Sequence, residues 1–360
     1  MADGDGAPDG VWPVVVRYPH GPVEEVVEAD AIDAARQAQS LMVRGPLFGV
    51  AVQDADVPAR WRLVTPVTSA TPQDARDSLN SLLWFRARDD TQDRDERRGL
   101  LAAVARLETE RIDELTALGR RYRVVRAEEY AGAGPDGIET PRPTDPEPAV
   151  PDWSRSSKDP EVDEGLVLDP AEPVTPTQAA ERFAMRSLAY SGDRYPQDVL
   201  RESARAVADY PEVLLLPTTY RVLKGRGDRW TIDGSLHTTA HGARQSLEFG
   251  LTWFEPRQKG LIDFDADRET DARTLVAAGT DPAADRLAEF VRAADLLRTE
   301  NANEVEVNGT ARRICRMRRL VRWGTDGPEG PRPSDTSLHP PEQIHPRLDE
   351  DGVIHHSSDA

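Results

Sequence analysis

One proline-rich string occurs twice in this chain and constrains the possible folds more than any other feature. The first copy, residues 134–145, reads GPDGIETPRPTD, and the second, residues 324–335, reads GTDGPEGPRPSD. Each copy follows an arginine-rich segment with the composition of a β-strand, RYRVVR from residue 121 and RICRMRRLVRW from residue 313. We therefore expect two related halves, each closed by a basic strand and a turn-rich loop.

Weaker matches follow one another in the same order along both halves. They pair residues 75–79 with 243–247, Trp84-Phe85 with Trp253-Phe254, Arg60-Trp61 with Arg229-Trp230, and Gly119 with Gly309. A shared order of matches is typical of an internal tandem duplication.

The apolar patterns predict an α+β fold in both halves. In the first half they predict strands at 11–18, 47–53, 60–67 and 121–130, and helices at 31–44, 72–88 and 96–118 with Gly119 as the last helix's C-terminal cap. This order resembles the βαββαβ order of a ferredoxin-like domain. In the second half they predict helices at 177–190, 196–209, 241–254 and 283–299, and strands at 213–224, 229–233, 261–264, 304–307 and 311–323.

Composition along the chain divides it into two tandem domains with polar flanks. We expect a disordered N-terminus at 1–10, a first α+β repeat at 11–148, a proline-rich acidic linker at 149–164, a second repeat at 165–338 and a disordered acidic tail at 339–360. The apolar patch at 166–168 is expected to open the second domain as a strand.

Charge and cysteine content limit the environment and the partners. The formal net charge is −19 and the pI about 4.9, which argues against general binding to nucleic acid. Cys315 is the single cysteine, so an intrachain disulfide is impossible. The N-terminus lacks the order of a signal peptide, and no apolar run approaches the roughly 20 residues that span a bilayer. We expect a cytoplasmic protein without membrane contact.

The arginine-rich strands are the first candidate for a ligand or partner site. Their candidate contact residues are Arg316, Arg318, Arg322, Arg123 and Arg126. Such a cluster in an acidic protein indicates either a patch for a phosphorylated or nucleic-acid ligand or a row that pairs with the chain's own carboxylates. The second interpretation is the one we favour.

The repeated loops are the second candidate. They display Arg142 and Glu139 in the first copy and Arg332 and Glu329 in the second, on segments stiffened by Pro-Arg-Pro. These residues indicate either a docking motif or an internal ion pair that fastens the loop. Because both copies retain them, we favour the fastening role, either within the chain or onto another molecule.

Other reactive residues carry weaker signals. His237 and His241 have the spacing of helix-borne zinc ligands, but no third ligand is evident and no metal or other cofactor is expected. The arginines beside Cys315 would lower the pKa of its thiol, although a buried hydrophobic role is the favoured interpretation. Phosphate-binding and nucleophile motifs are missing from the sequence, so no catalytic residue is assigned.

The two strings RYRVVR…GPDGIETPRPTD and RICRMRRLVRW…PRPSD resemble an uncharacterised family of streptomycete actinobacteria, a domain of unknown function. That resemblance implies no activity. We expect a non-enzymatic interaction or regulatory protein that binds a protein partner or self-associates. The alternatives are a binding module that uses the arginine strands and an enzyme without a recognisable motif.

Overall fold

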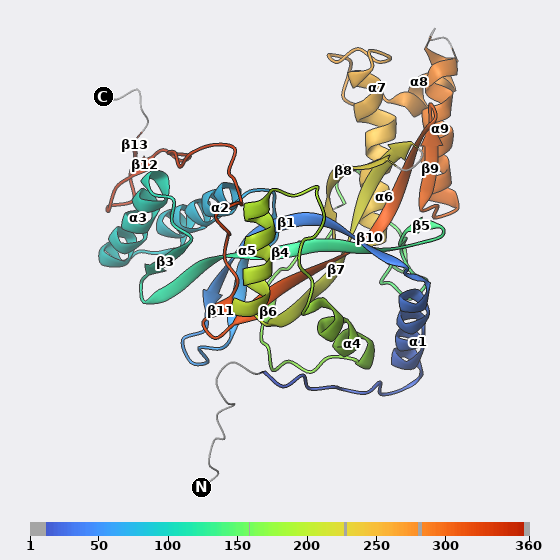
Figure 1. Cartoon of the computed structure of the whole chain (residues 1–360). Helices are drawn as coiled ribbons and strands as arrows, with labels where there is room; N and C mark the ends of the chain where they lie inside the picture. The colour runs from blue at the N-terminus through green and yellow to red at the C-terminus, as the bar shows by residue number, and fades with distance from the viewer. Residues whose placement is uncertain (1–11, 158, 227–228, 280–282, 356–360) are drawn as a thin grey trace.

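A single antiparallel sheet runs through both halves of the chain (Figure 1). The structure is a computed structural model that describes residues 12–157, 159–226, 229–279 and 283–355. The sheet has 11 strands, with the central order β6-β2-β1-β4-β10-β7-β8. Its first-half strands are β1 (Ser40–Gln53), β2 (Trp61–Ser69), β3 (Glu114–Ala117), β4 (Arg120–Gly134), β5 (Gly137–Ile138) and β6 (Val167–Leu168). Those of the second half are β7 (Glu212–Arg226), β8 (Arg229–His237), β9 (Glu304–Val307), β10 (Thr310–Gly324) and β11 (Gly327–Pro328).

Helices pack at the two ends of this sheet and beside its middle (Figure 1). At one end lie α2 (Pro72–Phe85), the π-helical turn η1 (Arg86–Asp90) and α3 (Arg94–Thr109). At the other lie α6 (Ala240–Phe249), η2 (Gly250–Phe254), α7 (Glu255–Gln258), α8 (Ala272–Ala278) and α9 (Ala284–Thr299). Beside the middle lie α1 (Pro22–Gln37), α4 (Pro176–Met185) and α5 (Gln197–Asp209). The molecule is thus a mixed α+β protein, as predicted at the level of class.

The two halves repeat both their elements and their strand register. Each half runs helix, strand pair, helices, strand pair, rather than in the βαββαβ order that we expected. Ser40 of β1 pairs with Ala133 of β4. The second half repeats this pair as Glu212 of β7, 172 residues after Ser40, with Trp323 of β10, 190 residues after Ala133. Val50 opposite Val124 likewise returns as Val222 opposite Ile314. These two offsets identify equivalent positions in the two halves.

The halves meet where β4 and β10 pair in the centre of the sheet. The register aligns Tyr130 with Arg318 and Ala127 with Val321. A hydrophobic cluster crosses this junction and includes Trp61 from the first half and Trp323 from the second, both essentially inaccessible. Because the core is shared, the two halves are parts of one packed body.

The prediction is wrong at the start of the first half. Within the described part of 11–18, the backbone forms only an isolated bridge from Val16 to Val174, and Val11 lies outside the described residues. The predicted helix at 31–44 is also displaced, since α1 begins at Pro22 and β1 already begins at Ser40. Gly45-Pro46 does not end a helix but lies at a β-bulge. In the sequence of α1, alanine and acidic residues obscure the helical period of the apolar residues.

Two other local predictions also fail. Gly119, at φ 71°, is not a helix cap but sits with Leu118 in the tight turn between β3 and β4, because α3 ends at Thr109. Residues 261–264 form a turn rather than a strand.

Strongly patterned elements are confirmed. Thr71 caps α2 with a complete capping box, and Pro72 occupies its first turn. The hairpins β1–β2, β7–β8 and β9–β10 form where predicted, and so do α4, α5, α6 and α9 within a few residues.

Polar segments after each repeated loop cross onto the other half. In the expected linker, the Asp159 carboxylate accepts the amides of Thr238 and Thr239 in the second half, and the buried Asp163 pairs with Arg319 of β10. The apolar patch at 166–168 forms a strand, β6, which pairs with β2. In the expected tail, β12 (Arg347–Leu348) and β13 (Ile354–His355) form a small hairpin, and the Trp84 indole donates to the Pro346 carbonyl at 3.1 Å. The described tail therefore packs on α2 and α3. The domain boundaries stay a prediction, and residues 1–10 lie outside the described part.

Candidate functional site

The repeated loops pack within the chain, each against the central strand of the opposite half. The Arg126 amide of β4 donates to the Glu329 carbonyl of the second loop at 2.9 Å. Equivalently, the Arg316 amide of β10 donates to the Glu139 carbonyl of the first loop at 2.8 Å. Each loop thus supplies an acceptor where the neighbouring strand would otherwise have an unpaired backbone group.

Side chains reinforce the contact of the second loop with β4. Arg126 reaches Glu128 at 2.5 Å and Asp335 at 2.8 Å, and all three side chains are buried. Within the loop, Arg332 pairs with Glu329 at 2.7 Å. The Arg322 guanidinium is also buried and donates to the main-chain carbonyls of residues 186 and 188.

The first loop makes the corresponding contact with β10. Arg316 pairs with Asp145 at 3.1 Å, and Arg318 pairs with Glu139 at 2.9 Å. Arg142 reaches Glu139 at 2.7 Å, as Arg332 reaches Glu329. Arginine–carboxylate pairs therefore hold both loops against the opposite central strand.

A further ion-pair group lies at the start of the second loop. Arg123 donates to the Asp326 carboxylate at 2.5 Å and to its carbonyl at 2.8 Å. The hydrogen bond from Arg121, together with the one from Arg123, lowers the pKa of Asp326 below its ordinary value.

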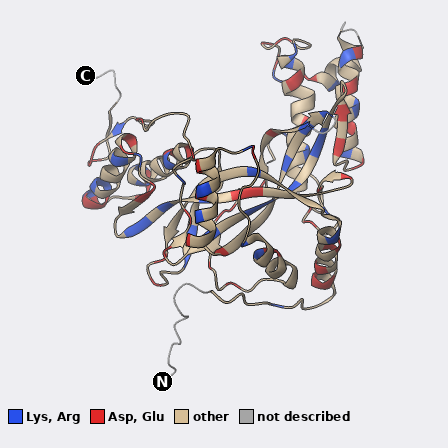
Figure 2. Ribbon diagram, viewed as in Figure 1, with Lys and Arg blue, Asp and Glu red and all other residues tan. Residues whose placement is uncertain are grey.

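All nine candidate contact residues from the sequence lie in or next to the two contacts that the repeated loops make with β4 and β10 of the opposite half. Figure 2 shows the basic segments of the central strands among acidic ones. Every arginine among them already contacts a carboxylate or carbonyl of this chain. Their contact with an external ligand or partner stays a prediction.

Acidification is expected to weaken this fastening. Burial raises the pKa of Glu128, but the neighbouring Arg126 and Arg332 more than offset that effect, and the pKa lies below its ordinary value of 4.5. A depressed carboxylate pKa contributes stability that is fully present above the unfolded-state pKa and is lost as pH falls through the folded-state pKa. Urea unfolding should therefore show stability falling below about pH 4.5, and the Glu128→Gln variant should show a shallower fall. The exposed change Glu25→Gln should leave the wild-type slope unaltered, and an unchanged slope in Glu128→Gln would contradict the assignment.

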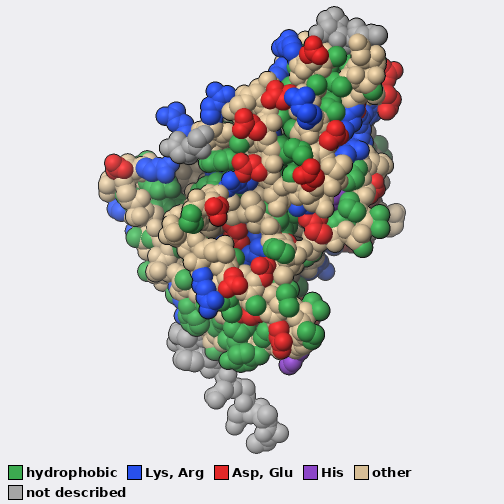
Figure 3. Space-filling view, turned by 90° about the vertical axis from the view of Figure 1, so that its right-hand side faces the viewer, with side chains coloured by type: hydrophobic (Ala, Val, Ile, Leu, Met, Phe, Trp, Pro, Cys, Tyr) green, Lys and Arg blue, Asp and Glu red, His purple; other side chains and the backbone are tan. Residues whose placement is uncertain are grey.

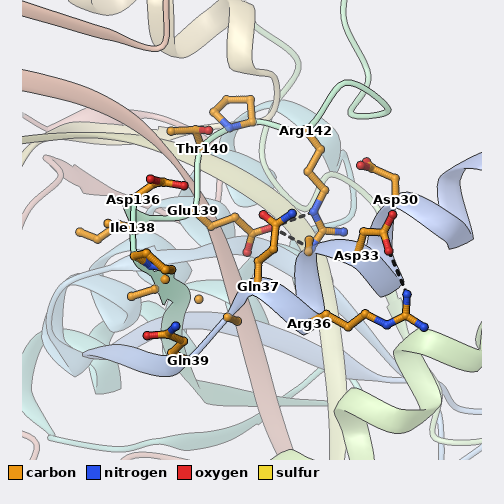
Figure 4. Close-up of a pocket in the computed structure, with 18 of the residues that line it drawn as sticks. Asp30, Asp33, Arg36, Gln37, Gln39, Asp136, Ile138, Glu139, Thr140 and Arg142 are labelled. Atoms are coloured by element: carbon orange, nitrogen blue, oxygen red, sulfur yellow. Dashed lines mark hydrogen bonds and ion pairs between the residues drawn. The ribbon is translucent and has the colours of Figure 1, made fainter.

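A cavity of about 620 Å³ opens beside the first loop (Figure 4). Its walls are the C-terminal half of α1, the end of β4, the loop from Gly134 to Pro143, and Arg313 of β10. Two ion pairs line it, Arg142 with Glu139 and Arg36 with Asp33 (Figure 4). No sequence motif marks the α1 wall of this cavity, although Asp33, Arg36 and Gln37 lie inside the helix predicted at 31–44.

A second cavity, of about 370 Å³, lies between α6 and the crossing segment that follows the first loop. Phe249 and Trp253 stack at 5.3 Å on one wall, and Trp153 forms another. His237 lines this cavity from the end of β8, not from a helix, so the proposed helical His237–His241 pair does not form. Across the described residues, no group of three or more potential ligands could hold a metal ion.

Cys315 is fully buried in the shared core. Burial raises the pKa of its thiol to about 12, although Arg313 and Arg44 act in the opposite direction. The expectation that nearby arginines would lower this pKa is therefore wrong, because desolvation dominates.

Together, the fold and its crossings define a mixed α+β protein whose two halves interlock through one sheet and two repeated loops. Residues 21–338 match a family of unknown function, DUF5954, and the chain belongs to this family. No curated protein and no solved structure matches the chain. None of the helices in the described ranges is long and apolar enough to cross a membrane.

Proposed function

We propose that this protein is a non-enzymatic, cytoplasmic interaction protein that arose by tandem duplication and docks a basic amphipathic segment of a partner protein on α1. The observation that carries the proposal is the orientation of α1. Its valines face solvent, and three of its acidic residues, Glu24, Glu28 and Asp30, contact the rest of the chain.

The outward face of α1 is apolar. Val23 is 76% exposed, and Val26 and Val27 lie on the same face at helical spacing, 59% and 44% exposed. Figure 3 looks onto the side of the molecule where α1 lies and shows hydrophobic side chains gathered over its lower part. An apolar face of this kind on a soluble body is typical of an interaction site.

Polar side chains of α1 contact the rest of the chain. Glu24 pairs with Arg17 at 2.9 Å, and Glu28 accepts the Thr177 amide of α4 at 2.6 Å. The equivalent helix α5 has the ordinary orientation, since it buries Ser203 and Ala206. The comparison indicates that the valine face of α1 is not a general requirement of the fold.

The charge of the α1 surface favours a cationic partner. Of the acidic residues of α1, Glu25 and Asp33 remain exposed to solvent, and Arg36 is the one arginine of the helix. A second copy of the chain would bring another net charge of −19 to this acidic surface, whereas a cationic segment would be attracted to it. The arginine-strand alternative is not favoured, because those guanidinium groups are already occupied.

The test is the binding of a synthetic Leu/Lys amphipathic helix to the full chain, measured by fluorescence anisotropy. A Leu/Glu peptide with the same apolar face should bind more weakly. Val26→Asp should weaken Leu/Lys binding about ten-fold, the value of burying one valine. The exposed Val353 lies away from α1, so Val353→Asp should bind like the wild type.

Three results would contradict the proposal. The first is no binding of either peptide, and the second is equal binding of both. The third is a dimer in light scattering that Val26→Asp dissociates, which would assign the face to a second copy.

A further inference from the structure

The cavity beside the first loop has an equivalent place in the second half, and there the chain fills it itself. A Cβ built on Gly134 would lie 2.8 Å from the Gln37 carbonyl at the end of α1. A Cβ on the equivalent Gly324 would lie 2.8 Å from the Asp209 carbonyl at the end of α5. The loop and the helix end therefore have the same arrangement in both halves.

Tyr210 occupies the second-half position. Its ring approaches the Cβ position of Gly324 to 2.9 Å. Burial raises the pKa of Tyr210, and Glu329, Asp326 and Arg123 act on its hydroxyl electrostatically, so the ring lies among these groups.

The first half has equivalents of the charged groups around Tyr210 but no aromatic ring at the Tyr210 position. The residues equivalent to Glu329, Asp326 and Arg123 are Glu139, Asp136 and Arg313, and all three line the cavity. The residue equivalent to Tyr210 is Ala38, which also lines it. The cavity is therefore the space that a phenol ring fills in the other half.

The first half also lacks one of the two arginines that pair with Asp326 in the second half. In the second half, Asp326 pairs with both Arg121 and Arg123, at 2.7 and 2.5 Å. In the first half, Arg313 still donates to the Asp136 carbonyl at 2.7 Å, but Ala311 stands where Arg121 would be. Within the described ranges, the Asp136 carboxylate has no hydrogen bond or ion pair.

We propose that this cavity binds an arylalkylamine, a small ligand that combines an aromatic ring with a cationic group. The ring takes the place of the Tyr210 ring beside Ala38, and the ammonium group pairs with Asp136. A volume of about 620 Å³ is within the range of small-molecule sites, roughly 300–1,000 Å³. This site is distinct from the outer face of α1, so Val26→Asp should retain it.

Titration of the full chain with tyramine, followed by calorimetry or NMR, tests the site. Tyramine should bind with a stoichiometry of one and more tightly than p-cresol, which lacks the cation, or 4-hydroxyphenylacetate, which carries an anion. Asp136→Asn should reduce the preference for tyramine over p-cresol by about two- to five-fold, the value of an exposed ion pair.

Two substitutions give each half the residue that the other half has at the equivalent position. Ala38→Tyr should fill the cavity and abolish binding, whereas Tyr210→Ala should open a second cavity and raise the stoichiometry for p-cresol from one to two. The second cavity should show no preference for tyramine, because Asp326 remains paired.

No binding of tyramine or p-cresol at millimolar concentration, or binding unaltered by Ala38→Tyr, would overturn the proposal. If Ala38→Tyr does not fold, an unchanged preference in Asp136→Asn together with an unchanged stoichiometry in Tyr210→Ala would overturn it.

Discussion

Replacing Asp163 with asparagine is expected to lower the free energy of unfolding by about 3–5 kcal/mol, because it leaves a buried guanidinium without its counter-charge. Asp163 and Arg319 are both inaccessible and form two hydrogen bonds, at 2.6 and 2.7 Å. Asp163 also accepts the Val67 amide at 3.0 Å, so it joins the crossing segment to both halves. Its φ of 61° is one that asparagine also tolerates, and the substitution therefore tests the charge rather than the backbone.

Urea unfolding of matched variants measures this effect. The control is Asp169→Asn, which breaks a partly exposed pair with Arg60 and should cost no more than about 1 kcal/mol. The double variant Asp163→Asn with Arg319→Met should recover part of the loss, because no uncompensated charge remains. A cost for Asp163→Asn as small as that of the control would show that the buried pair contributes little.

The second large effect is expected at Arg126. Arg126→Ala removes the guanidinium between the buried carboxylates of Glu128 and Asp335 and should cost about 3–5 kcal/mol. Hydrogen exchange should show the Arg126 amide losing protection, because its acceptor is the Glu329 carbonyl of the released loop.

The repeated strand register supplies the matched control. Arg316 is the equivalent of Arg126, but its side chain is 12% exposed, whereas that of Arg126 is 2% exposed. After Arg316→Ala, Asp145 would keep the Arg142 amide as a donor, and Glu139 would keep Arg142 and Arg318 as partners. We therefore expect Arg316→Ala to cost less than Arg126→Ala, and equal costs would contradict the role that we assign to burial.

Local sequence patterns were sufficient where a short segment has a strong period or a specific turn. The hairpin around Asn308-Gly309 and the capped start of α2 are confirmed for this reason. The pattern failed at α1, because alanine and acidic residues obscure the period of its few apolar residues. The period also gives no information on which face packs on the chain, and the valine face of α1 is turned to solvent.

Matching residues in matching order are enough to predict two similar halves, each with a basic strand and a proline-rich loop. The contact of each loop with the opposite half becomes apparent only in the folded chain. Arg126 and Asp335 are 209 positions apart, and no local pattern encodes which distant carboxylate an arginine will contact. The cavity depends on tertiary structure for the same reason, since the exchange of Tyr210 for Ala38 has meaning only once both helix ends lie beside their loops.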